Sequence, residues 1–303
     1  MVQPPGRNPI AGPSGAARMR FRLEYGALRG VDLLARALPL EVAVRLGGRL
    51  WARIAPRLGR HRRAGRHLAA MMPELPADER QRILRAMWRN LGETFVEALL
   101  LDRIAAEPER IALDPACRAV VRRVLEGGGV TVCPHLGNWE AAALPLAAAG
   151  VRHVAVYRRA KNPLVDAYLL AIRGRYYTGG LFAKGDAAAR GLLRQARRGG
   201  SLGFMADLRD SAGCNVPFFG RPAPSTPMPA MLARQYRLPL FAVCLVRVGP
   251  ARFRMEACEI EVSRTGDRAA DIGAATAQTQ RVFEAWIRQW PEQWMWAHRR
   301  YDT

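Results

Sequence analysis

The chain has 303 residues, 50% of them hydrophobic, and a formal net charge of +21, so it can bury a sizeable core and attract nucleic acid, an acidic bilayer or a phosphorylated lipid. Its five cysteines are odd in number and show no Cys-x-x-Cys spacing, which argues against a disulfide framework or a zinc ribbon and fits a reducing cytoplasm. Charged residues interrupt every apolar stretch before the about 18 residues that a spanning helix needs, so we expect peripheral or monotopic membrane contact.

The N-terminal part combines a tail with amphipathic helices. Residues 1–20 contain proline and glycine but no apolar segment of a secretory signal, which predicts a disordered tail. Residues 21–58 place apolar side chains at helical spacing with arginines between them, and we expect two or three helices, interrupted at Pro39 and Gly47–Gly48. Such helices suit a lipid interface. Packing of the same faces on a protein core explains the pattern equally well.

A further helical pattern follows the basic stretch at residues 59–67. It starts at Asp78, and its apolar positions recur through residue 96. We therefore expect residues 21–110 to form an N-terminal amphipathic helical region that associates with a membrane.

From about residue 115, short runs typical of strands alternate with helical stretches. These runs are 130–133, 153–157, 202–206, 239–248 and 253–262, and a final helix is expected over about 270–289. The alternation predicts an α/β domain over residues 111–303, with a mixed, partly parallel sheet flanked by helices.

The sharpest feature is the segment CPHLGNWE, residues 133–140. It joins a buried-looking strand to a helical run, and open α/β sheets bind their ligands beyond the strand ends. Asn138 suits a helix N-cap, which would place Glu140 in the first turn and leave His135 in the loop. A carboxylate beside a histidine fixes the imidazole tautomer and supports a general base. We predict that His135 and Glu140 form a catalytic pair; the alternative is a structural hydrogen bond.

The same segment bears on the rest of an ester-forming site. Backbone N–H groups around Gly137 and Asn138, or a nearby arginine, could stabilise a developing oxyanion. Cys133 is an alternative nucleophile, but its place at the end of an apolar strand favours buried packing. No second His or Cys stands at ligand spacing from His135, so we expect no metal.

Four further motifs follow HLGNWE along the chain. They are YRRAKNP (157–163), FMADLRD (204–210), VPFFGRPAPST (216–226) and PEQWMWAHRRY (291–301). In this order the five motifs resemble the bacterial lipid A biosynthesis acyltransferases, the late lauroyl or myristoyl transferases of the lysophospholipid acyltransferase superfamily. The resemblance spans roughly residues 20 to 301. It implies a glycerolipid-acyltransferase-like fold with 111–303 as the catalytic domain, a His-x4-acid motif at His135 and Glu140, and an acyl carrier protein or coenzyme A thioester as donor, with no cofactor.

The resemblance also implies substrate-binding residues. Arg158, Arg159 and Asn162 match a motif for the acceptor phosphate, which an arginine fork can grip with two charge-assisted hydrogen bonds. Asp207 falls in a short acidic block. From the residues alone, it could equally pair with an arginine or cap a turn.

Two later motifs imply lipid contacts. Phe218 and Phe219 match a block that shapes acyl or donor contacts, although adjacent aromatics are as often core residues. Arg299 and Arg300 would meet lipid phosphate beside interfacial tryptophans of the WMWAH segment.

The function we predict is transfer of a fatty acyl group to a hydroxyl of an anionic glycolipid, in the first place a Kdo-lipid A precursor, with His135 as general base. Expected partners are the acidic acyl carrier protein, the glycolipid and the membrane surface at the cytoplasmic face of the bacterial inner membrane, not nucleic acid. Many family members have an N-terminal hydrophobic anchor, which arginines interrupt here.

Two alternatives remain. One is a phosphatidylinositol mannoside acyltransferase, although those relatives commonly have Asp where this chain has Glu140. The other is a non-catalytic basic protein that binds membranes or nucleic acid.

Overall fold

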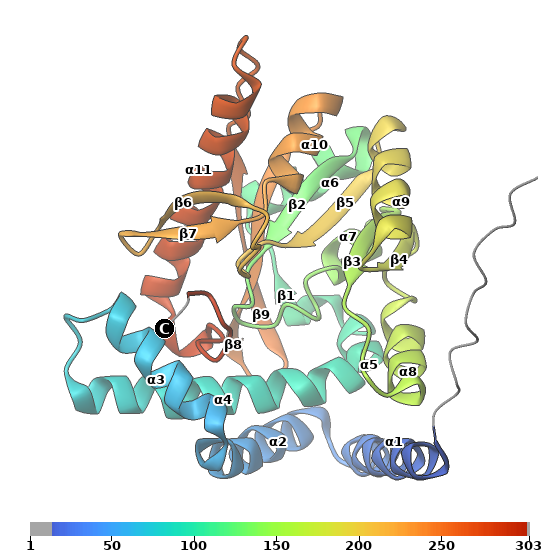
Figure 1. Cartoon of the computed structure of the whole chain (residues 1–303). Coiled ribbons are helices and arrows are strands. Elements are labelled where there is room, and N and C mark those ends of the chain that lie inside the picture. The colour runs from blue at the N-terminus through green and yellow to red at the C-terminus, as the bar shows by residue number, and fades with distance from the viewer. Residues whose placement is uncertain (1–13, 302–303) are drawn as a thin grey trace, which may run out of the picture.

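The computed structural model describes residues 14–301, apart from the side chains of residues 186 and 187. A sheet stands at the centre of the molecule, with helices against its faces and others across its lower end (Figure 1). The strands, in chain order, are β1 (Ile111–Ala112), β2 (Gly129–Cys133), β3 (His153–Tyr157), β4 (Gly180–Ala183), β5 (Ser201–Met205), β6 (Cys214–Phe218), β7 (Arg221–Ser225), β8 (Leu240–Gly249) and β9 (Arg252–Ile260).

The main sheet is mixed and mostly parallel, as the sequence predicts. Its strand order is β1-β9-β8-β2-β5-β3-β4, and β6 and β7 form a separate antiparallel hairpin. The strands from β8 to β4 in that order are parallel, whereas β9 and β1 run in the opposite direction. β2 is buried along its whole length, which requires helices on both faces of the sheet. Because β2 and β5 are parallel neighbours, the segments that leave their carboxyl ends meet at one edge.

Helices make up the rest of the fold. They are α1 (Gly15–Arg36), α2 (Leu40–Ile54), α3 (Gly59–Met71), α4 (Ala77–Leu99), α5 (Leu101–Ala105), α6 (Pro115–Gly127), α7 (Leu144–Ala148), α8 (Pro163–Arg173), α9 (Asp186–Arg197), α10 (Met228–Tyr236) and α11 (Arg268–Gln289). Three 3-10 turns add η1 (Ala55–Arg57), η2 (Pro108–Arg110) and η3 (Pro291–Gln293). The predicted strands coincide with β2, β3, β5, β8 and β9, and the predicted final helix is α11.

The crossing of α2 and α4 corrects one prediction. Gly47 and Gly48 lie inside α2, so the interruption expected there is wrong, whereas Pro39 does precede the start of α2. A Cβ on Gly47 would come within 2.3 Å of Cγ2 of Val96, and one on Gly92 within 2.7 Å of the carbonyl oxygen of Gly47. The glycines therefore allow two helices to approach closely and do not end one of them.

The N-terminal helices are partly packed and partly exposed. Residues 15–20 belong to α1, so disorder is the wrong prediction for them, and residues 1–13 lie outside the described residues. One hydrophobic core joins α2 and α4 to the sheet. The division at residue 110 stays a prediction.

Outward faces of α1 and α2 nevertheless carry large exposed apolar side chains: Met19, Leu23, Val31, Leu33, Leu34, Val42, Leu46, Leu50, Trp51 and Ile54. Both core packing and a free amphipathic face are thus present. None of the described helices is long and apolar enough to cross a membrane.

Candidate active site

The loop after β2 carries His135 and is held by its glycine and asparagine. Gly137 has φ +61, and a Cβ there would lie 1.9 Å from the carbonyl oxygen of Leu245, so only glycine fits without a shift. The side chain of Asn138 donates to Glu97 at 2.8 Å and accepts from the Ala141 N–H at 3.0 Å. It closes a turn, and the helix itself begins only at α7.

His135 pairs with Asp207 from the end of β5. Nδ1 of His135 lies 2.7 Å from Oδ1 of Asp207, and the backbone N–H of His135 donates to Oδ2 at 2.7 Å. The indole N–H of Trp294 donates to the same oxygen at 2.8 Å. Burial alone would raise the pKa of Asp207, but the His135 charge and these donors outweigh it and hold that pKa well below its usual range. The carboxylate is therefore ionised, and Nδ1 of His135 carries the proton between them.

A second histidine stacks on the first. The ring centroids of His298 and His135 are 4.5 Å apart. Burial, together with the charge of His135, lowers the pKa of His298 to about 3, so His298 is neutral near pH 7. A neutral neighbour lets His135 take up a proton without repulsion from a second cation.

Glu140 pairs with Arg173 and not with His135. Arg173, the last residue of α8, donates to Glu140 from Nε at 2.7 Å and from Nη2 at 2.6 Å. The expectation that Glu140 orients His135 is therefore wrong, and Asp207 occupies that position. The physical reason is that Asn138 closes a turn, after which Glu140 contacts Arg173. The carboxylate that contacts His135 follows the neighbouring strand β5 and does not come from the same loop.

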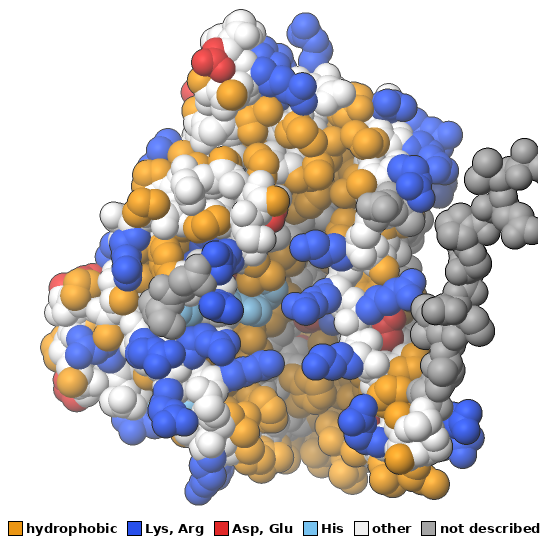
Figure 2. Space-filling model, in the orientation of Figure 1, with side chains coloured by type: hydrophobic (Ala, Val, Ile, Leu, Met, Phe, Trp, Pro, Cys, Tyr) orange, Lys and Arg blue, Asp and Glu red, His pale blue; other side chains and the backbone are white. Residues whose placement is uncertain are grey.

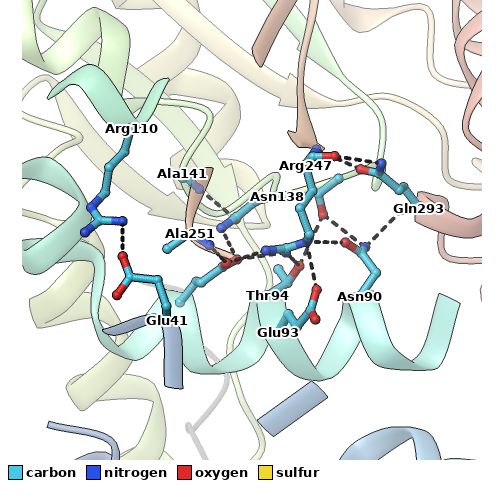
Figure 3. Close-up of polar contacts among 12 residues, drawn as sticks. Glu41, Asn90, Glu93, Thr94, Arg110, Asn138, Ala141, Arg247, Ala251 and Gln293 are labelled. Carbon is cyan, nitrogen blue, oxygen red and sulfur yellow. Dashed lines mark hydrogen bonds and ion pairs between the residues drawn. The ribbon is translucent and has the colours of Figure 1, made fainter. Parts of the chain in front are cut away.

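A buried ionic network supports the loop from below (Figure 3). Arg247 of β8 lies between Glu93 and Glu97 of α4, at 3.1 Å from Glu93 and in contact with both oxygens of Glu97. Burial raises the pKa of Glu93, which the charge of Arg247 opposes. Glu97 also accepts from Asn138, so the network reaches the His135 loop directly.

A cavity opens beside this site. Its volume is about 910 Å³, and the charged side chains and histidines of its lining include His135, Glu140, Arg158, Arg173, Lys184, Arg209 and Asp210. Most of the remaining lining is apolar and comes from the sheet strands and from α9. In Figure 2 a histidine is visible in a hollow ringed by Lys and Arg side chains. Such a cavity suits an apolar ligand with a polar reacting end.

A sequence model of the bacterial lipid A biosynthesis acyltransferases matches residues 23–303. The chain belongs to this family. It is therefore an acyltransferase. This favours an enzyme over the alternative of a non-catalytic basic protein that binds membranes or nucleic acid. No individually curated protein matches the chain.

The oxyanion donors expected in this acyltransferase are already occupied. The N–H of Gly137 donates to the carbonyl of Gln293 at 3.0 Å, and that of Asn138 to Leu245 at 2.9 Å. The expectation that these two groups face an oxyanion is therefore wrong. Their expected role in loop support agrees with these contacts, since the Gly137 carbonyl also accepts from Asn90 and Thr94.

Three residues expected to bind substrate are instead structural in the acyltransferase. Asn162 caps α8 through its oxygen and donates from its amide nitrogen to Phe21 and Glu24 of α1. Phe218 and Phe219 are buried against the C-terminal tryptophans and do not line the cavity. The acyl-groove role of the two phenylalanines is therefore not supported by their positions.

The arginines divide into buried and exposed groups. Arg300 is fully buried and donates to the Pro224 carbonyl at 2.7 Å and the Ser225 hydroxyl at 2.6 Å, so it cannot meet lipid phosphate. Trp294 and Trp296 are also core residues and not interfacial ones. Arg158, Arg159 and Arg299 are exposed, and Arg158 lines the cavity.

The candidates for a cysteine nucleophile and for metal ligands are Cys133 and the His, Cys, Asp and Glu side chains. Cys133 is buried, and burial raises its thiol pKa far above the usual range, which disfavours a nucleophile. Among the described residues, no group of His, Cys, Asp and Glu side chains is arranged to hold a metal ion.

Sequence reasoning missed three site residues of the acyltransferase. Trp294 and His298 lie in the PEQWMWAHRRY motif, so the motif marked them although their roles were not deduced. Nothing local marks Arg173, which ends an ordinary helix.

Proposed function

We propose that this acyltransferase moves a fatty acyl group from an acyl carrier protein or coenzyme A thioester to a hydroxyl of an anionic glycolipid, in the first place a Kdo-lipid A precursor. The observation that supports it is the His135–Asp207 pair, whose His135 lines a largely apolar cavity. The cations around the hollow suit an acceptor that carries phosphate (Figure 2).

His135 is the general base in this proposal. Because Nδ1 donates to Asp207, Nε2 is the nitrogen that takes the proton of the acceptor hydroxyl. The hydroxyl oxygen attacks the thioester carbonyl carbon as that proton moves. The C–S bond then breaks, and the proton passes from Nε2 to the leaving sulfur, giving an ester and a free thiol. Asp207 stabilises the imidazolium between the two steps.

Arg173 supplies positive charge beside the reacting carbonyl. It uses Nε and Nη2 for Glu140, which leaves Nη1 for the carbonyl oxygen as negative charge develops there. Glu140 is thus a positioning residue for Arg173. Arg158, which lines the cavity, and its exposed neighbour Arg159 would hold the acceptor phosphate.

The acceptor is tested with the purified wild-type enzyme, a labelled acyl carrier protein donor and a panel of lipids in detergent. We expect mass spectrometry to show acylation of a Kdo-lipid A precursor. If the enzyme acylates phosphatidylinositol mannoside in preference, the alternative acceptor is the correct one. Absence of transfer to every anionic lipid from every thioester donor would refute the proposed function.

Membrane attachment would use the exposed apolar faces of α1 and α2, at the cytoplasmic face of the bacterial inner membrane. Figure 2 shows an apolar surface along the lower edge of the molecule, where Figure 1 places α1 and α2. Arginines beside it, including Arg45, Arg49 and Arg53, are exposed and suit anionic headgroups.

Leu46→Glu with Leu50→Glu is expected to weaken binding to vesicles of anionic phospholipid by about tenfold or more, since each buried leucine contributes about 1.5–3 kcal/mol. Vesicle co-sedimentation measures this. Leu125→Glu with Val248→Glu is the matched control, because both residues are exposed apolar side chains outside α1 and α2. Equal loss in both double variants would exclude α1 and α2 as the attachment surface.

A further inference from the structure

The outward face of α9 is a stripe of exposed arginines. Arg190, Arg194, Arg197 and the adjoining Arg198 are all exposed and recur at helical spacing. The sequence has no acidic residue between Asp186 and Asp207. The stripe therefore carries concentrated positive charge.

The side chains of these four arginines point to solvent, without a partner among the described residues. None of the four side chains forms a hydrogen bond or an ion pair with another residue in the described part of the chain. Some exposed arginines elsewhere do have carboxylate partners, in pairs such as Arg82–Glu79, Arg123–Glu259 and Arg288–Glu284. The α9 face is thus free to meet an acidic partner.

The opposite face of α9 is a wall of the active-site cavity. Ala188, Ala189 and Leu192 line the cavity, as do Lys184 and Gly185, which immediately precede the helix. A partner bound on the arginine face therefore lies across one helix from the space beside His135. A flexible thioester arm would enter past Lys184.

The α9 face is also separate from the apolar lower edge. Figure 1 places α9 at the upper right of the molecule and α1 and α2 at the bottom, and Figure 2 shows basic side chains gathered over α9. A partner on α9 would approach from the aqueous side while a lipid enters from the membrane side. The two substrates would not compete for one surface.

We propose that the arginine face of α9 docks the acyl carrier protein, which is acidic and delivers its acyl group on a flexible arm. This inference rests on the proposed thioester-dependent function. Long-range attraction between the basic helix and the acidic carrier would raise the rate of encounter, and salt would weaken it.

The test combines Arg190→Glu, Arg194→Glu and Arg197→Glu in the full chain. We expect kcat/KM with acyl carrier protein as donor to fall by about tenfold or more, as loss of electrostatic steering predicts. Transfer of the same acyl chain from a neutral N-acetylcysteamine thioester should stay within about twofold, because that donor makes no carrier contact. Binding of holo-acyl carrier protein, measured directly at low and high salt, should weaken in parallel.

The control is Arg122→Glu, Arg268→Glu and Arg281→Glu, which makes the same charge change at exposed arginines outside α9. Equal losses in the two triple variants, or unchanged carrier binding in the α9 variant, would overturn the docking surface. So would loss of vesicle binding with carrier binding intact, which would assign α9 to lipid headgroups. A wild type that binds the carrier through α9 but transfers from no thioester would refute the function and leave the docking surface standing.

Discussion

Asp207→Asn is expected to lower kcat for acyl transfer by about a thousandfold or more, as happens when the carboxylate behind a catalytic histidine becomes an amide. Asp207 accepts hydrogen bonds from Nδ1 and the backbone N–H of His135 and from Trp294. An amide has one acceptor oxygen for these three donors. If its NH₂ group faces Nδ1, the imidazole proton moves to Nε2, and Nε2 can no longer accept a proton from the substrate.

Glu140→Gln is the matched control for Asp207→Asn, because it makes the same chemical change at the other carboxylate. Glu140 contacts Arg173, so we expect a smaller decrease in kcat than for Asp207→Asn. Initial rates at saturating donor, with circular dichroism to verify the fold, compare the two. A larger effect for Glu140→Gln would return the role of histidine partner to Glu140.

Arg247→Met is expected to reduce the free energy of unfolding by about 3–5 kcal/mol, the usual cost of removing one partner from a buried ion pair. Arg247 is nearly buried, and its loss leaves Glu93 and Glu97 without their shared cation. Met fills much of the same space, so the change tests charge more than volume. Because Glu97 also holds Asn138, we expect reduced acyl transfer below the unfolding midpoint as well.

Urea denaturation measures this loss. Arg82→Met is the control, because the Arg82–Glu79 pair lies on the exposed face of the same helix, α4, and surface pairs contribute little. Similar midpoints for Arg247→Met and the wild type would contradict a structural role for the network.

The fold could largely be predicted from periodicity, because burial imposes it. Runs such as 130–133 and 202–206 contain no charged residue, as is usual for strands in the interior of a covered sheet, and they coincide with β2 and β5. Periodicity could not reveal that α4 crosses α2 at Gly47. A glycine pair has the same local pattern whether it ends a helix or admits a neighbouring one.

The position of the candidate site could be predicted from the sequence, but the contacts between its residues could not. The strand, loop and motif around His135 indicate its catalytic role, whereas its partner Asp207 lies 72 residues away. Nearness in sequence favours Glu140 as the partner of His135, but the fold pairs Glu140 with Arg173. The order β2-β5 brings Asp207 to His135, and this order is a tertiary property, although an acid at the end of a second apolar strand was a usable signal.

Residue type misled the prediction at the C-terminus. Trp296 and Arg300 have the composition of a membrane interface, yet both are fully buried. Arg300 is satisfied there by carbonyl and hydroxyl oxygens, a set of partners that only the fold brings together.

The most direct measurement of the central claim is acyl transfer from acyl carrier protein to a Kdo-lipid A precursor by wild type and His135→Ala, matched for folding by circular dichroism. The account predicts transfer by the wild type and a decrease of about 10²–10⁴-fold or more in the variant, the contribution typical of a general base. Transfer by His135→Ala at a rate close to that of the wild type would contradict it.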